Sequence, residues 1–249
     1  MVTLLQFRRC FMPSARPYAV VFDAYGTLFD VHSVASTIEK LFPGRGTQLS
    51  QLWRGKQLEY TFLRTLGERY VDFWAITESS LQYACDALML PLDPGGRHRL
   101  MQAYTELSPF TETLEVLLAL RESRRQLAIL SNGSPAMLQA LVTNANMENL
   151  FARVLSVDAV RQYKPAPAVY ELACRTLGLQ PERIVFVSAN GWDAAGAGWY
   201  GFRPYWVNRQ ATPIERLDSP PRKTATTLRG LPEYLDHLDS LQNPDSRAG

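Results

Sequence analysis

The sequence is poor in cysteine and has no long apolar run. Three cysteines occur in 249 residues, at Cys10, Cys85 and Cys174, far apart and without a Cys-x-x-Cys pair. This spacing argues against a disulfide framework and a cysteine-rich metal site, and it favours reduced thiols in a cytoplasmic protein. No apolar run approaches the length of a membrane span, so we expect no membrane partner.

A strong charge of either sign is also missing. The formal net charge is +2, charged residues make up 20% of the chain, and no long basic run occurs. Nothing therefore indicates nucleic acid or an anionic membrane as a partner. The apolar fraction of 46% is ordinary for a globular protein. The length fits one core domain with a smaller inserted domain better than two full domains.

Strand-like patterns are missing between Asp30 and Pro109. Helical periodicity covers that region in the ranges 34–41, 49–66, 70–90 and 98–107. From there on, helical patterns alternate with apolar, β-branched runs at 127–130, 151–157, 184–187 and 205–207. Buried strands that alternate with helices predict an α/β fold with a doubly wound parallel sheet.

The two patterns predict a division of the chain. We expect a core domain made of residues 17–30 and 110–241, with residues 31–109 inserted as a helical cap subdomain. Residues 1–16 are predicted to be a disordered extension, unless translation starts at Met12. Residues 242–249 are predicted to be a frayed polar tail.

The first strand ends on an acid. Ala19–Phe22 is apolar without alternation, which is typical of a strand buried on both faces. Asp23 follows directly, and Gly26 allows the chain to turn sharply. Asp23 is therefore expected at the carboxyl end of a central strand, where open α/β sheets place their chemistry. Taken alone, Asp23 could equally begin a turn.

Polar side chains also follow the later strands. Ser131 and Asn132 end one strand, Lys164 precedes a helix, and Ser188, Asn190 and Asp193 follow the strand after it. Each could be a helix cap, a loop residue or a first-turn acid. Their joint order predicts one crevice at the carboxyl edge of the sheet. Arg54 shares a helical face with Leu58 and Phe62, a pattern that by itself favours a surface Arg lying over apolar neighbours.

The segment Phe22–Leu28 resembles the first motif of the haloacid dehalogenase (HAD) superfamily. Most members are phosphatases with Asp-x-Asp-x-Thr, whereas this chain has Tyr25 in place of the second acid. An acid must protonate a leaving alkoxide, but a halide leaves as a stable anion. Asp-x-Tyr-Gly-Thr-Leu-Phe-Asp is the form seen in L-2-haloacid dehalogenases, and the similarity extends over most of residues 18–208.

The resemblance implies a set of site residues. The implied catalytic residues are Asp23, Thr27, Arg54, Ser131, Lys164, Tyr170, Ser188, Asn190 and Asp193. The implied substrate and halide contacts are Ala24, Tyr25, Arg54, Leu58, Phe73, Ser131, Asn132 and Trp192. No metal and no cofactor is implied. The implied partners are a small halogenated carboxylic acid, a halide ion and a second copy of the chain, joined through cap helices.

The implied reaction has two steps. Asp23 would attack C2 of an L-2-haloacid and displace halide with inversion. Lys164 would hold the Asp23 carboxylate, and Arg54 would receive the halide. Water would then attack the Asp23 ester, activated by Asp193 with Ser188 and Asn190, and release a D-2-hydroxyacid.

Three other functions remain open from the sequence. The first is a HAD phosphatase, which Tyr25 disfavours. The second is hydrolysis of another small 2-substituted acid, such as fluoroacetate or azetidine-2-carboxylate, because only the leaving group changes. The third is a catalytically silent binding domain, which has no need of Asp23, Arg54, Lys164 and Asp193 together.

Overall fold

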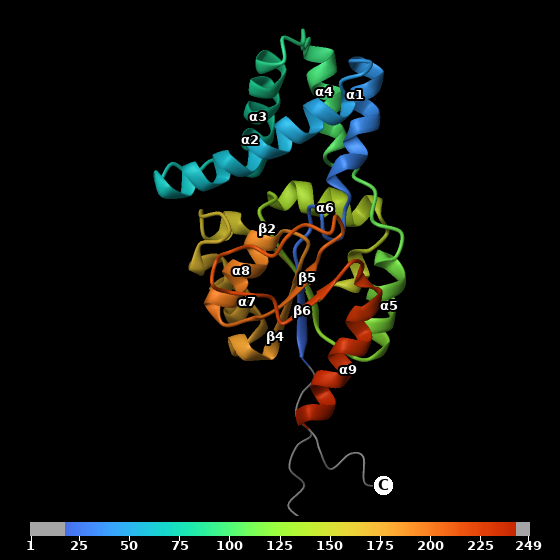
Figure 1. Ribbon diagram of the computed structural model, residues 1–249, viewed down its shortest axis with the longest axis vertical. Helices are drawn as coiled ribbons and strands as arrows, with labels where there is room; N and C mark the ends of the chain where they lie inside the picture. Colours follow the sequence, from blue (N-terminus) through green and yellow to red (C-terminus); the bar gives the residue numbers. More distant parts are fainter. Residues whose placement is uncertain (1–17, 243–249) are drawn as a thin grey trace, which may run out of the picture.

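The computed structural model describes residues 18–242. A parallel sheet forms its centre, with helices on both faces (Figure 1). The strands lie in the order β3-β2-β1-β4-β5-β6, with β1 (Ala19–Phe22), β2 (Leu127–Ser131), β3 (Arg153–Ser156), β4 (Ile184–Ser188), β5 (Arg203–Val207) and β6 (Lys223–Ala225). The predicted extension 1–16 and tail residues 243–249 lie outside the described residues.

The centre of the sheet is apolar on both faces. Every residue of β1, β2 and β4 is buried, and Phe22 pairs with Ile129 on one side and Val187 on the other. The core helices are α5 (Thr113–Glu122), α6 (Pro135–Asn144), α7 (Pro167–Leu177), α8 (Gly191–Tyr200) and α9 (Leu231–Gln242). Figure 1 shows α5 and α9 on one side of the sheet and α7 and α8 on the other. The predicted doubly wound α/β class is confirmed.

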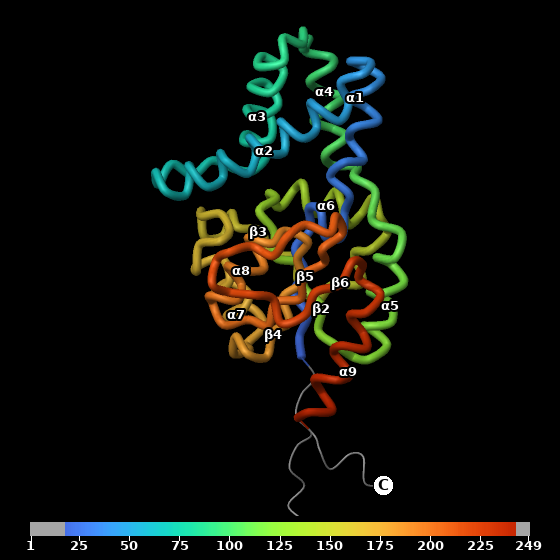
Figure 2. Tube along the Cα trace, in the orientation of Figure 1, coloured from blue at the N-terminus to red at the C-terminus, as the bar shows by residue number. Residues whose placement is uncertain are grey.

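Consecutive helices stand over the carboxyl ends of the strands (Figures 1 and 2). They are α1 (Ala35–Leu41), α2 (Gly46–Leu66), α3 (Phe73–Ala87) and α4 (Pro94–Ala103), preceded by the 3-10 turn η1 (Val31–Val34). The chain passes from the sheet to these helices near Asp30 and returns near Phe110, and the two connecting segments run side by side. Asp30 N–H donates to Ser108 O at 2.8 Å, and Phe110 N–H donates to Leu28 O at 3.0 Å. We propose residues 31–109 as a cap subdomain on this basis, with 17–30 and 110–241 as the core.

Several predicted element bounds were wrong, for local reasons. Helix α4 begins at Pro94 rather than at residue 98, because Asp93 caps it by accepting from Gly96 N–H and Pro is tolerated at the first helical position. Helix α3 is shorter than 70–90, because Asp72 caps its start. Helix α2 begins at Gly46 rather than at residue 49. Strand β6 was missed, since its three residues are mostly exposed and carry no apolar run.

The remaining short turns are η2 (Glu148–Leu150), η3 (Val157–Ala159), η4 (Pro181–Arg183) and η5 (Leu228–Gly230). In the part of the chain that the structure describes, no helix combines the length and the apolar character needed to cross a membrane.

Candidate active site

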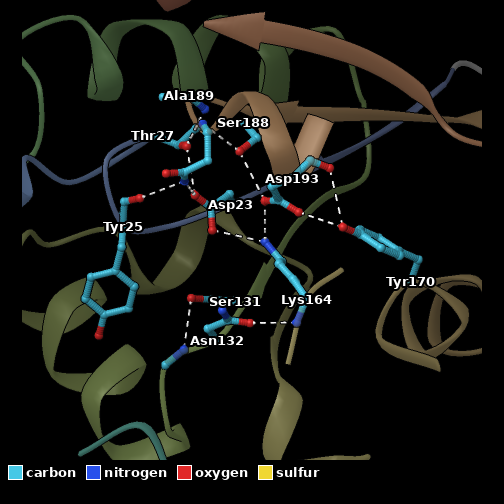
Figure 3. Close-up of polar contacts among 12 residues, drawn as sticks. Asp23, Tyr25, Thr27, Ser131, Asn132, Lys164, Tyr170, Ser188, Ala189 and Asp193 are labelled. Atoms are coloured by element: carbon cyan, nitrogen blue, oxygen red, sulfur yellow. Dashed lines mark hydrogen bonds and ion pairs between the residues drawn. The ribbon is translucent and has the colours of Figure 1, made fainter. Parts of the chain in front are cut away.

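Asp23 lies at the carboxyl end of β1, and both oxygens of its side chain accept hydrogen bonds (Figure 3). Its backbone N–H donates to Val187 O at 2.9 Å, so the sheet fixes where the side chain starts. Oδ2 accepts from Thr27 Oγ1 and Asn190 Nδ2, both at 2.9 Å. Oδ1 accepts from Lys164 Nζ at 3.0 Å. Oδ1 therefore has one donor among the described residues and Oδ2 has two.

Lys164 joins the two carboxylates of the site. Its Nζ lies 3.0 Å from Asp23 Oδ1 and 2.9 Å from Asp193 Oδ2, and the side chain is 1% exposed. Burial disfavours the ammonium, but the charges of Asp193 and Asp23 outweigh burial and raise the pKa of Lys164. One cation thus faces two carboxylates, which leaves the cluster with a net negative charge when both acids are ionised.

Asp193 lies in the first turn of α8, fully buried. Its Oδ2 also accepts from Ser188 Oγ at 3.1 Å, and its Oδ1 accepts from Tyr170 OH at 2.8 Å. Burial raises the pKa of Asp193 to about 6, with Lys164 opposing that rise and Asp23 adding to it. Burial, followed by the charge of Asp193, also raises the pKa of Tyr170, so the phenol stays a hydrogen-bond donor.

Thr27 connects the Asp23 loop with the loop after β4. Its Oγ1 accepts from Ala189 N–H at 2.8 Å and donates to Asp23 Oδ2, which fixes the direction of its proton. Asn190 adds a second link between these two loops, because its Nδ2, which donates to Asp23 Oδ2, also lies 3.3 Å from Tyr25 O. The sequence did not indicate Ala189, since a backbone N–H leaves no signal in residue type.

Ser131 ends β2 and Asn132 follows it, and the two side chains make different hydrogen bonds. Asn132 Oδ1 accepts from Lys164 N–H at 3.1 Å, so its amide N–H₂ must point away from that contact. Ser131 Oγ accepts from Gly133 N–H at 3.2 Å and forms no hydrogen bond to the other predicted site residues. The N–H groups of Ala24 and Tyr25 donate to no other described residue. Four donor groups for an anion, namely the Asn132 N–H₂, the Ser131 hydroxyl and the two backbone N–H groups, are therefore uncommitted within the described chain near the strand ends.

The cap contributes Arg54 and Leu58 from α2. Together with Gly26 and Asn190 of the core, they line a cavity of about 270 Å³. The interpretation of Arg54 as a plain surface residue is therefore disfavoured. Its guanidinium donates to Gln57 Oε1 at 2.6 Å, a contact that the sequence pattern did not indicate.

Tyr25 and Phe73 form an aromatic wall between core and cap. Their ring centroids lie 5.4 Å apart, and Gly133 packs so closely that an added Cβ would lie 2.8 Å from the Tyr25 ring. Burial, and to a lesser extent the electrostatic effect of Tyr104, raises the pKa of Tyr25. The Tyr25 hydroxyl has no hydrogen-bond partner among the described residues. Tyr25 is therefore not an acid–base group near neutral pH.

Trp192 does not line the cavity of Arg54 and Leu58. It lies in a second, more apolar cavity of about 380 Å³ with Phe62 and Lys164, and its ring meets that of Phe62 edge-on at 5.2 Å. Of the predicted pocket walls, Leu58 therefore lines one cavity and Trp192 another, which meets α2 further along its length at Phe62. Within residues 18–242, no group of three His, Cys, Asp or Glu side chains is placed to hold a metal ion.

The parallel-sheet fold and the cluster around Asp23 agree with one family of hydrolases, which a comparison with family models identifies. The family model described as haloacid dehalogenase-like hydrolase matches residues 18–201, and the chain belongs to this family. Within it, the chain is 47% identical to the (S)-2-haloacid dehalogenase of Pseudomonas sp. strain YL over 217 residues, which cover 87% of this chain and 94% of the relative. The resemblance predicted from the motifs is confirmed.

Solved structures agree with this placement. A crystal structure of an L-2-haloacid dehalogenase superposes with a TM-score of 0.86 at 51% identity, covering 88% of this chain and 99% of the other. The L-2-haloacid dehalogenase of Xanthobacter autotrophicus with chloropropionic acid covalently bound superposes with a TM-score of 0.83 at 40% identity, covering 89% and 99%.

Proposed function

We propose that this hydrolase removes halide from short-chain L-2-haloacids and releases D-2-hydroxyacids, through an ester of Asp23. The observation that carries the proposal is the Asp23 carboxylate, held by Lys164, Thr27 and Asn190 in a chain of this family with Tyr25 two residues further on. A fixed carboxylate with restricted solvent access suits attack on a saturated carbon.

In the first step, Asp23 Oδ1 forms a bond to C2 as the carbon–halogen bond breaks. We assign Oδ1 because it has a single donor among the described residues, which leaves a lone pair for the substrate. The halide departs with the bonding electrons toward Arg54, with Asn132 N–H₂ and Phe73 as further contacts. Ser131 and the N–H groups of Ala24 and Tyr25 would bind the substrate carboxylate, since these donors are uncommitted.

In the second step, water attacks the Asp23 ester carbonyl rather than the substrate carbon. Asp193 accepts the proton, and Ser188, Tyr170 and Asn190 hold the groups around it. The ester bond then breaks, and the leaving alkoxide takes up the proton that Asp193 accepted. Asp23 regains its carboxylate, with an oxygen from water, as the second proton of that water is lost to solvent. The hydroxyacid leaves with the former Asp23 oxygen.

The phosphatase alternative lacks support at Tyr25. A phosphatase needs an acid at this position to protonate the leaving oxygen. The buried phenol of Tyr25, with its raised pKa, cannot supply that proton near neutral pH. Hydrolysis of fluoroacetate or azetidine-2-carboxylate would use the same Asp23 chemistry, and no contact described above favours either substrate.

The decisive experiment is a single turnover in ¹⁸O-water with excess enzyme and L-2-chloropropionate. The ester route puts heavy oxygen into the peptide that contains Asp23 and leaves the product essentially unlabelled. Label in the product with none in Asp23 would refute the nucleophile. Parallel assays with D-2-chloropropionate, chloroacetate, fluoroacetate and a phosphate ester, with and without EDTA, define the substrate; we expect halide release from the L-chloro acid that survives the chelator.

Two wider predictions accompany this function. We propose a homodimer through the cap, supported by the exposure of Leu63 and Leu66 at the end of α2; light scattering of the wild type and of Leu66→Glu tests it.

We also propose a cytoplasmic location, supported by Cys85 and Cys174, which are unpaired thiols in the described chain; cell fractionation tests that.

A further inference from the structure

Arg54 is held by a neutral side chain. Its Nη1 donates to Gln57 Oε1 at 2.6 Å, and among residues 18–242 no carboxylate lies within ion-pair distance of it. Its charge therefore remains uncompensated while one of its N–H groups is anchored. A guanidinium has five N–H donors, so other donors remain for a ligand in the cavity that Arg54 lines.

Gln57 is a buried polar residue on the inner face of α2. It is 0% exposed and lies between Trp53 and Thr61, which are also fully buried, at a spacing of four residues. A buried amide must find partners or lose stability. Gln57 finds its second partner on α3, where Nε2 donates to Thr77 Oγ1 at 2.7 Å.

The direction of the Gln57 amide is fixed by Thr77. The Thr77 hydroxyl donates its proton to Phe73 O at 2.6 Å, so toward Gln57 it can act only as an acceptor. Nε2 must then face Thr77, and Oε1 must face Arg54. Tyr104 OH approaches the same Oε1 at 3.5 Å. A flipped amide would direct its N–H₂ at the guanidinium and its oxygen at the Thr77 oxygen, so neither contact would pair a donor with an acceptor.

We propose that Gln57 is a positioning residue, which aims the Arg54 guanidinium at the departing halide and keeps its full positive charge available. The inference rests on the proposed function of Arg54 as the halide-binding cation. A carboxylate oxygen at this position could accept from the guanidinium as Gln57 Oε1 does. It would also neutralise the charge that the halide needs.

The test compares Gln57→Glu with the wild type. We expect the variant to bind bromide at least about tenfold more weakly by calorimetry in halide-free buffer, a change that corresponds to about 1.4 kcal/mol. We also expect kcat/KM to fall about 10²-fold for L-2-chloropropionate and less for L-2-bromopropionate, because the poorer leaving group depends more on Arg54. The exposed Gln51→Glu on the same helix is the matched control, with unchanged bromide affinity and an unchanged ratio of the two substrates.

A purely structural role would reduce both substrates equally and leave bromide binding unchanged, which would overturn the inference. If Gln57→Glu does not fold, the pair Thr77→Val and Thr77→Ser decides: Val should weaken bromide binding by removing the acceptor, and Ser should restore it. Unchanged bromide binding in Thr77→Val would overturn the inference. Calorimetry needs no turnover, so an inactive wild type with Gln57-dependent bromide binding would reject the proposed function alone.

Discussion

The core and the cap hold their charged site residues in opposite ways. In the core, the Lys164 ammonium contacts both Asp23 and Asp193, and every oxygen of these two carboxylates accepts a hydrogen bond. In the cap, Arg54 contacts the neutral amide of Gln57 and no carboxylate of the described chain. In the core, the carboxylates are held by a residue of opposite charge. In the cap, the orientation of the Arg54 guanidinium is fixed by a neutral residue, and its charge is not neutralised.

This difference matches the parts that the two regions play in the proposed reaction. Asp23 must keep one position while a bond to it forms and later breaks, so several contacts from different elements are an advantage. The site for the leaving group must interact weakly before the halide forms and strongly afterwards. An uncompensated guanidinium meets that requirement, because it gains its partner only as charge develops.

The largest effect is expected from Asp23→Asn, which removes the nucleophile and keeps the side-chain shape. Turnover should fall by about 10⁴-fold or more, measured as halide release by ion chromatography. Asp72→Asn is the matched control, since Asn can also accept from Ala75 N–H at the start of α3. Mass spectrometry must verify that deamidation of the introduced amide, which would regenerate Asp23, stays below the assay limit; retained activity in that verified variant would refute the ester mechanism.

The next effect should come from Lys164→Met, which leaves two buried carboxylates without their cation. Turnover should fall by about 10³-fold, and the free energy of unfolding should decrease by about 3–5 kcal/mol. The control is Arg125→Met, another buried cation that pairs with Asp236 and Asp239 away from the site. It should lower stability in urea titration but leave kcat unchanged; equal loss of kcat in both variants would assign Lys164 a merely structural part.

The sequence predicted the core side of the site better than the cap side. Strand ends have a strong signal, because apolar runs such as Ile184–Val187 stop abruptly at polar residues, and parallel strands bring those residues together. The motif match then identified Asp23, Lys164 and Asp193, which the structure joins in one network. What the sequence could not supply was the direction of each hydrogen bond, which depends on tertiary neighbours such as Ala189 N–H.

The cap side was harder because helical periodicity reports burial and not contacts. On periodicity alone, Arg54 was interpreted as a surface residue, although it lines the cavity with Asn190. A usable signal existed in Gln57, a polar residue that falls on the same helical stripe as the apolar Leu49 and Trp53. Recognising its partner Thr77 required knowledge of how α2 packs on α3, which the sequence pattern does not give.

Arg54→Lys sharpens the comparison, because it keeps the cap charge and removes the planar fork. We expect turnover to fall by about 10²-fold, since Lys offers a compact, strongly hydrated charge that cannot bind Gln57 and halide in the same geometry. The exposed Arg64→Lys on α2 is the control and should match the wild type. Halide release near the wild-type rate from Arg54→Lys would make Arg54 a bystander.

The smallest effect concerns the protonation of Asp193. Burial raises its pKa to about 6 in the free enzyme, and the Asp23 charge contributes to that rise. Protonation below this pKa removes the proposed base, so one pH unit lower about a tenth of the free enzyme keeps it ionised. Formation of the ester neutralises Asp23, however, so Asp193 is then the single carboxylate that pairs with Lys164. The pKa of Asp193 should therefore be lower in the ester than in the free enzyme.

Asp23→Asn reproduces this loss of charge without turnover. ¹³C NMR of labelled aspartate carboxyls should find the Asp193 titration near pH 6 in the wild type and at lower pH in Asp23→Asn, with Asp193→Asn to assign the signal. In rapid-quench experiments, ester decay should then keep most of its rate at a pH where half of the free enzyme has Asp193 protonated. An Asp193 pKa that is the same with and without the Asp23 charge would show that the two carboxylates do not interact through Lys164, and that ester formation does not prepare the base for the second step.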